Sequence, residues 1–363
     1  MQRVAIVGLG LIGGSIGLGL RRWSEQNGKS GEGALEVIGF DTDLDQQHYA
    51  KKIGAVDRAE WELGKAIRDA DLVVVCTPVR ATREVFGDIG PHLKSGAVVT
   101  DTGSTKAEVL AWAQELLPNT VSFVGGHPMA GKAQSIEGAD AELFKSATWC
   151  VTPAVTAGDP AIRNVLGMIA ALGAEPYFLD PGEHDAYVAG ISHLPFVLAA
   201  TLMNSLSKDS SWRDMKSLTA GGFRDMTRLA GGSPDMHRDI ALTNRQALLR
   251  WVDACQASLQ DFRASLDVAD EQAAADLTKF FTDARDARAE WATQTTREGE
   301  LLQGTQAELS KEGFGDQMGR MLFGGFMRKR GSAGDRLGRP RGGVPGSGSR
   351  TATRDRENGS RQN

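Results

Sequence analysis

Short apolar runs alternate with amphipathic segments over the first half of the chain. The runs rich in Val and Ile, which we interpret as strands, are residues 4–9, 36–41, 72–78, 97–103, 121–126 and 148–153. Because these runs lack polar alternation, they indicate strands buried on both faces, as in a mostly parallel sheet. A helix is predicted at 11–23, and the polar, Gly-rich stretch 24–34 is predicted to be an exposed loop. The pattern predicts an α/β fold, with a doubly wound Rossmann-type domain over residues 1–180.

The strand pattern stops after residue 180. Apolar positions then recur at helical spacing over 183–206, 236–266 and 271–298. Pro195 lies inside the first of these segments and predicts a kink or a break there. Long apolar helices need a partner surface, so we expect an all-α domain over residues 181–310 that forms a homodimer.

Composition separates a third region. The length of 363 residues suits two domains of about 100–200 residues each. Residues 311–363 carry twelve Lys and Arg against five Asp and Glu, and the rest of the chain carries 29 against 41. We expect a disordered basic tail, solvated or, as the alternative, an interaction arm. The acidic body does not suggest nucleic-acid binding.

Cysteine use and the uncharged N-terminus bear on localisation. Cys76, Cys150 and Cys255 are odd in number and lack metal-ligand spacing, which fits a reducing cytoplasm without disulfides. The uncharged run 4–20 approaches the length of a membrane span but holds six glycines. A buried strand, a glycine turn and a helix explain it better than an anchor or a signal peptide, so we expect a cytoplasmic protein with no membrane partner.

The first strand and helix flank the sequence G-x-G-x-x-G. Gly8 permits a tight turn, Gly10 lets the backbone approach a pyrophosphate, and Gly13 allows close packing of helix on strand. The helix N-terminus offers free N–H groups to the phosphates. The residues that we assign to this cofactor site are Gly8, Gly10, Leu11, Ile12, Gly13, Asp41, Thr77 and Pro78.

Asp41 directs the choice of cofactor. An acidic residue at the end of the second strand accepts hydrogen bonds from ribose hydroxyls and repels a 2′-phosphate. It lies further from the glycines than the usual spacing of about 20 residues, and no Arg follows it directly. We therefore expect NAD rather than NADP.

Candidate chemistry follows the later strands. His127 stands where ligands bind in open α/β sheets and is a candidate general base, with Ser104 as a residue that orients its imidazole. A turn or capping histidine is the alternative for His127. His184 and His193 are, each taken alone, more often structural, and no spacing supports a metal site. Arg228, beside a Gly-Gly turn, suits recognition of a carboxylate, with a surface arginine as the alternative.

Taken together, these motifs resemble one family. GLGLIGGS, TDTGSTK, GGHPMAG, EHD, SHLP and GGFRDMTR occur in the order found in the prephenate/arogenate dehydrogenases of tyrosine biosynthesis. The resemblance covers about residues 1–300. It implies an NAD-dependent oxidative decarboxylation of a cyclohexadienyl substrate, in which the nicotinamide is the electron sink and no metal is needed.

The resemblance also implies roles for single residues. His127 corresponds to the catalytic histidine that binds the ring hydroxyl, and Ser104 to its serine partner near the nicotinamide. Arg228 corresponds to the arginine that holds a substrate carboxylate, and Gly222 and His193 to residues that shape the substrate site. Two departures, Phe196 in place of a histidine and His237 in place of an aromatic residue, are expected to face the substrate side chain. They leave the choice between prephenate and arogenate open.

Two other functions remain as alternatives at this point. A Rossmann hydroxyacid dehydrogenase with a helical second domain would need a catalytic lysine, but Lys208, Lys216 and Lys279 lie in ordinary polar settings. A non-catalytic NAD-sensing protein would keep the glycine motif and Asp41 without needing both His127 and Arg228.

Overall fold

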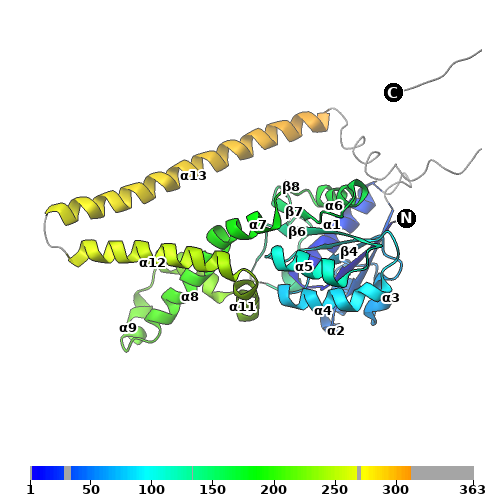
Figure 1. The fold of residues 1–363 in the computed structure, drawn as a ribbon, viewed down its shortest axis with the longest axis horizontal. Helices are drawn as coiled ribbons and strands as arrows, with labels where there is room; N and C mark the ends of the chain where they lie inside the picture. The colour runs from blue at the N-terminus through cyan, green and yellow to red at the C-terminus, as the bar shows by residue number, and fades with distance from the viewer. Residues whose placement is uncertain (1, 28–33, 133, 268–270, 312–363) are drawn as a thin grey trace, which may run out of the picture. The chain divides into compact units, whose positions relative to one another are not determined.

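The structure is a computed structural model that describes residues 2–27, 34–132, 134–267 and 271–311 (Figure 1). The strands are β1 (Gln2–Val7), β2 (Leu35–Phe40), β3 (Arg58–Ala59), β4 (Leu72–Val75), β5 (Val98–Asp101), β6 (Ser122–Pro128), β7 (Thr148–Pro153) and β8 (Glu175–Phe178). Within the described residues they form an eight-stranded sheet of order β3-β2-β1-β4-β5-β6-β7-β8. Neighbouring strands are parallel except β6 and β7. The predicted mostly parallel Rossmann-type sheet is confirmed.

The two strands that the sequence pattern missed lie at the two edges of this sheet. β3 has two residues and pairs only with Ile38 and Gly39 of β2. β8 is largely exposed, so its sequence carries no buried apolar run. Edge strands gain little from burial, and hydrophobic patterning therefore does not detect them.

Helices of the first half of the chain cover both faces of the sheet. They are α1 (Leu11–Asn27), α2 (Leu44–Lys52), α3 (Leu63–Ile67), α4 (Val79–Ile89), α5 (Ala107–Leu116) and α6 (Asp159–Ala171), with short 3₁₀ turns at Gly90–His92 and Ile136–Gly138. α1 runs four residues beyond its predicted end, so the first part of the expected loop 24–34 is helical. An amide hydrogen bond of 2.9 Å from Asn27 Nδ2 to the carbonyl of Trp23 closes this last turn. Residues 28–33 of that loop lie outside the described residues.

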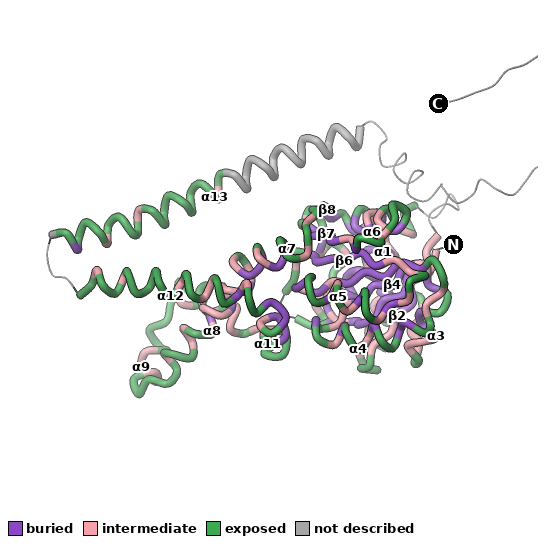
Figure 2. The backbone as a smooth tube through the Cα atoms, in the orientation of Figure 1, coloured by how far each residue is buried: buried purple, intermediate pink, exposed green. Residues whose placement is uncertain are grey.

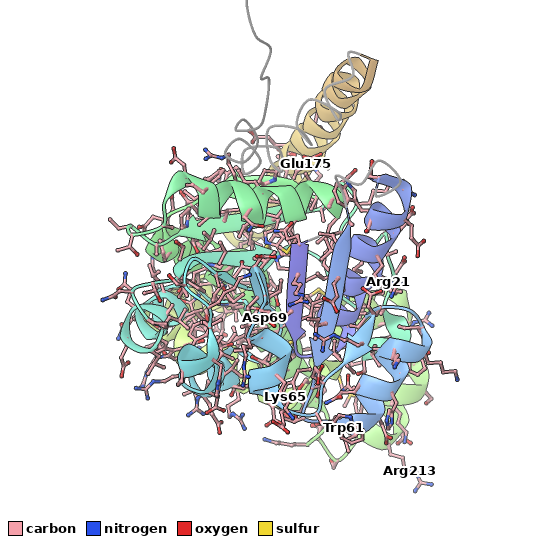
Figure 3. All side chains as sticks on the ribbon, turned by 90° about the vertical axis from the view of Figure 1, so that its right-hand side faces the viewer. Arg21, Trp61, Lys65, Asp69, Glu175 and Arg213 are labelled. Atoms are coloured by element: carbon pink, nitrogen blue, oxygen red, sulfur yellow. The ribbon has the colours of Figure 1, made fainter. Side chains whose placement is uncertain are left out.

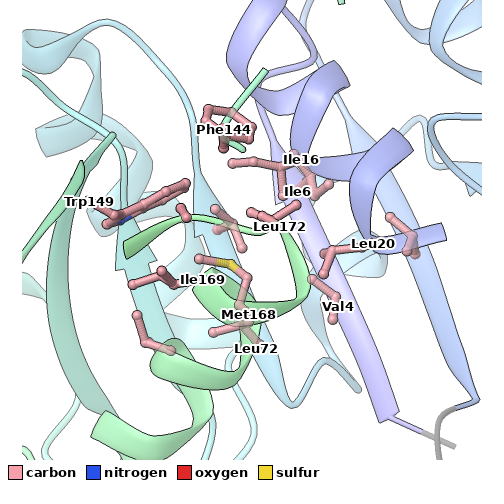
Figure 4. Close-up of a cluster of buried hydrophobic side chains, with 14 of the residues drawn as sticks. Val4, Ile6, Ile16, Leu20, Leu72, Phe144, Trp149, Met168, Ile169 and Leu172 are labelled. Atoms are coloured by element: carbon pink, nitrogen blue, oxygen red, sulfur yellow. The ribbon is translucent and has the colours of Figure 1, made fainter. Parts of the chain in front are cut away.

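Alternation along β1 explains the two cores. Val4 and Ile6 pack with α1 and α6 on one face (Figure 4), whereas Ala5 and Val7 pack with α4 and α5 on the other. Successive strand side chains point to opposite faces, so a strand between two helical layers must be apolar at every position. Figure 2 shows this buried sheet at the centre of the domain.

The outer surface of this domain is charged. Arg21, Lys65 and Asp69 carry their charges at its periphery (Figure 3). Arg21 pairs with Asp57 at 2.5 Å and Lys65 with Glu62 at 2.7 Å. Exposed pairs of this kind contribute about 0–1 kcal/mol each, so the domain is held together by its two apolar cores.

The second half of the chain is helical, which confirms the predicted all-α region. Its helices are α7 (Pro181–Val188), α8 (Leu194–Leu206), α9 (Trp212–Met215), α10 (Gly221–Thr227), α11 (Pro234–Thr243), α12 (Arg245–Asp267) and α13 (Glu271–Lys311), with 3₁₀ turns at Lys216–Leu218 and Arg228–Gly231. The domain boundary at residue 180 stays a prediction, because residues Met1–Gly325 group as a single compact unit. The predicted basic tail, apart from Lys311, lies outside the described residues.

The irregularity predicted at Pro195 takes the form of a π-helical segment, Ala189–His193, directly before α8. The proline stands in the first turn of α8, where its missing N–H is tolerated. Helical structure therefore continues from Pro181 to Leu206. Among the described residues this is the helix long and apolar enough to cross a membrane by length and composition alone. It carries the buried polar residues His184, Asp185 and His193, which is typical of a helix that packs inside a protein.

Two further differences from the predicted helices concern the site. The helix expected at 236–266 is broken at Asn244, whose ψ of 37° lies outside the helical range. The predicted Gly-Gly turn is instead the beginning of α10, because Gly221 and Gly222 occupy its first turn after an extended Ala220. The first difference places Asn244 at the end of α11, and the second places the Gly-Gly pair in the first turn of a helix.

Candidate active site

The glycine loop between β1 and α1 has the shape that a dinucleotide needs. Gly8 has φ +94°, a backbone conformation that residues other than glycine rarely adopt. A Cβ on Gly13 would lie 1.9 Å from the carbonyl oxygen of Gly8, so helix and turn touch there. A Cβ on Gly10 would meet nothing within 4 Å, which leaves open space in front of this backbone. The first turn of α1 holds no acidic side chain, so its N-terminus is free to attract phosphate.

Asp41 directly follows β2 and braces this loop. One carboxylate oxygen accepts a hydrogen bond of 2.6 Å from the N–H of Leu9, and the other accepts one of 2.9 Å from the N–H of Asp43. A carboxylate has about four acceptor positions, so ribose hydroxyls can still bind. Sequence reasoning assigned Asp41 to the ribose alone and missed its contact with the glycine loop.

The other residues assigned to the cofactor site lie at the same edge of the sheet. Leu11 and Ile12 begin α1, and Pro78 precedes α4. The hydroxyl of Thr77 lies 3.2 Å from that of Thr82. Because β1 and β4 are parallel neighbours, their carboxyl ends place these residues at one edge of the sheet, at the point where the strand order reverses.

His127 lies within β6 and is buried. Sequence reasoning placed it just past the strand, and this was wrong, because the antiparallel partner β7 extends the ladder to Pro128 and pairs His127 with Cys150. Its Nδ1 lies 2.9 Å from Nε2 of His184. In turn, Nδ1 of His184 lies 2.8 Å from a carboxylate oxygen of Asp185. We call these three side chains the His–His–Asp row.

Asp185 also joins α7 to α5. Its two carboxylate oxygens accept hydrogen bonds of 2.7 Å from the N–H of Lys106 and 2.9 Å from that of Ala107. These donors belong to the N-terminus of α5, which has no side-chain cap of its own. An acidic residue from another element therefore satisfies free N–H groups and the positive end of the helix dipole.

Lys106 and Asp101 form a fully buried ion pair beneath His127. The ammonium of Lys106 also donates to the carbonyl of Gly126 at 2.7 Å. Asp101 accepts from the N–H of Gly103 at 2.8 Å and from that of Gly126 at 3.1 Å. This pair ties the loop after β5 to the residue that precedes His127. The lack of a side chain at Gly126 is required, since a Cβ there would lie 2.7 Å from the carbonyl of Asp101.

Burial determines the protonation state of His127 and of His193. Desolvation lowers the pKa of His127 well below its usual value of 6.5, and electrostatic interactions with His184, Lys106 and His193 lower it further. Desolvation likewise lowers the pKa of His193 to about 4, although Asp185 opposes this shift. His127 is therefore neutral at pH 7 and able to accept a proton, as a general base requires.

A second set of contacts extends from His193 to the segment around His237. Asn244 donates to the carbonyl of Asp185 at 2.7 Å and lies 3.2 Å from Nδ1 of His193. The ring of Phe196 stacks on that of His237, with centroids 4.2 Å apart and planes inclined by 7°. The rings of His193 and Phe196 are 5.9 Å apart. The two residues that depart from the family pattern are thus in contact with each other and adjoin the site.

Arg228 contrasts with this buried set. It is exposed, and the described part of the chain holds no hydrogen bond or ion pair of its guanidinium. It begins the 3₁₀ turn Arg228–Gly231, which packs on α8. Gly222, in the first turn of α10, is also exposed. The structure thus leaves Arg228 unpaired for a ligand without showing the ligand's position.

Ser104 does not orient His127 in this structure. The imidazole is held by His184, and no hydrogen bond between the Ser104 hydroxyl and His127 is found among the described residues. The backbone of Ser104 instead favours the charged form of His193 and so opposes the lowering of the His193 pKa. A cluster of side chains able to hold a metal ion is absent from the described residues.

Sequence reasoning assigned no site role to several residues of this network, namely Asp101, Lys106, His184, Asp185 and Asn244. The signal that could have found them is the adjacent pair His184–Asp185 at the start of an apolar helix. Charged groups in that position need buried partners. The motif that holds Asp101 and Lys106, with both charges next to a buried strand, gives the same signal.

Known proteins match this chain over both halves. Residues 29–177 match the family model described as prephenate dehydrogenase, nucleotide-binding domain. Residues 180–283 match the model described as prephenate dehydrogenase, dimerization domain. The prephenate dehydrogenase of Bacillus subtilis is 32% identical over 288 residues, which are 78% of this chain and 75% of that protein. The cyclohexadienyl dehydrogenase of Zymomonas mobilis is 32% identical over 268 residues, which are 73% of this chain and 88% of that protein.

Solved structures agree with these matches. The prephenate dehydrogenase of A. aeolicus, in complex with hydroxyphenyl propionate and NAD+, superposes with a TM-score of 0.72 at 28% identity over 80% of this chain and 98% of that one. The arogenate dehydrogenase of Synechocystis superposes with a TM-score of 0.65 at 28% identity over 80% of this chain and all of that one.

Proposed function

The chain belongs to the prephenate dehydrogenase family, and on this premise we propose that it catalyses the NAD-dependent oxidative decarboxylation of prephenate or arogenate in tyrosine biosynthesis. Family membership confirms the resemblance found in the motifs and removes the hydroxyacid dehydrogenase and the NAD sensor as alternatives. The observation that carries the proposal is the neutral, buried His127 on β6. It stands at the same sheet edge as the glycine loop that follows β1.

The glycine loop fits the cofactor. The open space before Gly10 and the N-terminus of α1, whose first turn holds no acidic side chain, suit a pyrophosphate, and Asp41 suits ribose hydroxyls rather than a 2′-phosphate. When bound, NAD supplies the hydride acceptor, and the reacting carbon is the one that bears the substrate hydroxyl. A relative of 28% identity was solved with NAD+, which supports NAD over NADP here.

His127 would act on the substrate hydroxyl. As the carbon loses hydride, the C–O bond gains double-bond character and the hydroxyl proton moves toward the imidazole. The bond between the ring and its carboxylate then breaks, its electron pair enters the ring, and CO₂ leaves. The oxygen of the new aromatic ring takes the proton back from His127. Overall the substrate loses one hydride and one CO₂, and His127 returns to its neutral form.

Arg228 would hold a substrate carboxylate, with Gly222 and His193 shaping the same site. An unpaired guanidinium can bind a carboxylate through two parallel hydrogen bonds. The Phe196–His237 stack would face the substrate side chain, where prephenate carries a keto acid and arogenate an amino acid.

We also propose that the chain works as a cytoplasmic homodimer. The apolar helix α8 buries only Phe196 and Ala199, and Leu249 and Leu259 of α12 are exposed. These surfaces lie in the region matched by the dimerization-domain model. Light scattering on the purified chain would show the mass of two copies, and a monomer at micromolar concentration would contradict this part of the proposal.

The activity itself is tested by following NADH absorbance with prephenate and with arogenate, each with NAD and with NADP. We expect turnover with NAD and at least one of the two substrates. Changing His127→Ala should lower kcat by about two to four orders of magnitude, the usual contribution of a positioned base. Circular dichroism and thermal melting control for folding. A folded variant that loses less than tenfold would exclude His127 as the base.

A further inference from the structure

The His–His–Asp row has one direction of hydrogen bonding. Its members are almost fully buried, with exposed fractions of 8% for His127, 0% for His184 and 5% for Asp185. The N–H of Lys106, the N–H of Ala107 and Nδ1 of His184 all lie at hydrogen-bonding distance from the Asp185 carboxylate. The two backbone N–H groups are fixed donors, and a carboxylate that accepts from both of them also accepts from the ring nitrogen. Asp185 therefore requires the proton of His184 to be on Nδ1.

The direction then propagates to His127. In the tautomer that carries its single proton on Nδ1, His184 offers a lone pair at Nε2 and accepts there. The atom facing it at 2.9 Å is Nδ1 of His127, which must donate. A neutral imidazole carries one N–H, so Nε2 of His127 is left with its lone pair.

We propose that His184 and Asp185 are positioning residues that hold His127 in the tautomer with Nε2 free to accept the substrate hydroxyl proton. This rests on the proposed role of His127 as the base. No proton moves along the row in this scheme. The substrate proton goes to Nε2 of His127 and returns to the ring oxygen, while His184 and Asp185 keep their protonation throughout. Asp185 stabilises, through His184, the positive charge that develops on His127, as the buried carboxylate does in the Ser-His-Asp arrangement.

The other charged groups near His127 do not set its tautomer. The ammonium of Lys106 donates to Asp101 and to the carbonyl of Gly126 rather than to the imidazole. His193 is hydrogen-bonded toward Asn244, and Cys150, the β7 partner of His127, has a thiol whose pKa is raised by burial and which stays neutral. Among the described residues, the row supplies the hydrogen bond that orients the ring.

Two substitutions of His184 separate positioning from packing. His184→Leu fills similar space but removes the acceptor, so the buried N–H of His127 loses its partner and the other tautomer becomes favourable. His184→Gln keeps an acceptor for His127 and a donor for Asp185. We expect His184→Leu to lower kcat about 100-fold or more with KM changed less than about threefold, and His184→Gln to recover most of that loss. His92→Leu, at an exposed histidine away from the site, is the matched control and should leave kcat unchanged.

A third variant reverses the row. In Asp185→Asn an amide nitrogen that faces Nδ1 of His184 donates to it and gives up the bond from the Lys106 N–H, which moves the His184 proton to Nε2 and makes His127 accept at Nδ1. Nε2 of His127 then carries the proton and is no longer a base. We expect kcat to fall as much as in His184→Leu. We also expect the decrease of kcat at acidic pH, which reflects protonation of Nε2 of His127, to disappear from the pH profile.

NMR spectroscopy observes the tautomer of each histidine directly. Long-range ¹H–¹⁵N spectra of the ¹⁵N-histidine-labelled full chain, without substrate, show which ring nitrogen of each histidine carries the proton. We expect Nδ1–H for His127 and His184 in the wild type, and Nε2–H for His127 in His184→Leu and Asp185→Asn. Nε2–H for His127 in the wild type would overturn the proposal, as would full kcat in folded His184→Leu. Because the spectra need no turnover, a chain that proved inactive would refute the proposed function and leave the tautomer result standing.

Discussion

The surroundings of His127 and those of Arg228 represent opposite ways of building one active site. His127 is buried in a network of hydrogen bonds from β5, β6 and α7, anchored by the Lys106–Asp101 pair. Arg228 lies at the exposed junction of two short helical segments with no partner of its own in the described residues. The difference teaches that, in the proposed function, the fold itself fixes the base, whereas the guanidinium proposed to bind the substrate has no partner among the described residues.

Breaking the buried side of this comparison should have the largest effect. Lys106→Met leaves the carboxylate of Asp101 buried without its counter-charge, which typically costs about 3–5 kcal/mol. Urea denaturation of the two proteins measures the loss. The double variant Lys106→Met with Asp101→Leu removes both charges and should be clearly more stable than the single one. A single variant as stable as the wild type would show that the pair does not hold the site together.

The next largest effect is expected from acid, which should lower the stability of the fold around the buried histidines. The pKa of His193 falls from 6.5 in the unfolded chain to about 4 in the folded one, so the unfolded chain binds the proton more tightly. Stability is therefore complete above pH 6.5 and declines as the pH falls toward 4, by about 3 kcal/mol from this residue alone. The lowered pKa of His127 acts in the same direction. Urea midpoints at pH 7.5, 6, 5 and 4 measure the slope, and His193→Gln should flatten it.

Substitution of the exposed Arg228 should change substrate binding rather than the stability of the fold. Arg228→Ala removes a charge-assisted carboxylate contact and should raise the substrate KM about 10- to 100-fold, with kcat changed much less. The free energy of unfolding should stay within about 0.5 kcal/mol of the wild type, because Arg228 is exposed and its guanidinium has no hydrogen bond or ion pair among the described residues. NAD affinity, measured by fluorescence titration, serves as the internal control. A large defect in NAD affinity would assign Arg228 to the cofactor instead.

The smallest effect is expected at the cofactor loop, where Asp41 both forms a hydrogen bond within the fold and is available to a ligand. Asp41→Ser removes the charge that repels a 2′-phosphate and should narrow the preference for NAD over NADP about tenfold, as measured by kcat/KM for each cofactor. Because Asp41 also accepts from the N–H of Leu9, affinity for NAD should fall as well. Asp41→Asn, which keeps an acceptor for that N–H, should show the smaller loss in NAD affinity. An unchanged NAD/NADP ratio would exclude Asp41 as the discriminating residue.

The sequence predicts the fold of this chain well wherever burial dictates residue type. The central strands are runs of Val and Ile because helices cover both faces of the sheet, and the glycine turn has a pattern that its geometry requires. The failures fall where burial gives no periodic signal. β3 and β8 are edge strands, and the break at Asn244 serves a hydrogen bond to Asp185, which is distant in sequence.

The candidate site follows the same rule. Gly8, Gly10 and Gly13 are recognisable because one short loop contains the whole motif. The partner of His127 was not recognisable, because His184 lies 57 residues away and meets it only through the packing of α7 on α5. Ser104, closer in sequence, was assigned that role by motif. A histidine by itself does not state its partner, and only tertiary packing selects one of several.

The cap that Asp185 places on α5 has a consequence for recombining these enzymes. One carboxylate fixes the imidazole pair and also joins the helical half of the chain to the nucleotide-binding half, a junction that the hydrogen bond between Thr105 and Thr243 reinforces. A chimera of two relatives that is joined before residue 184 needs the incoming half to supply a His-Asp pair in register with the free end of α5. A junction after residue 185 keeps His184 and Asp185 with their own α5, so the network around His127 stays intact while the Arg228 segment is exchanged.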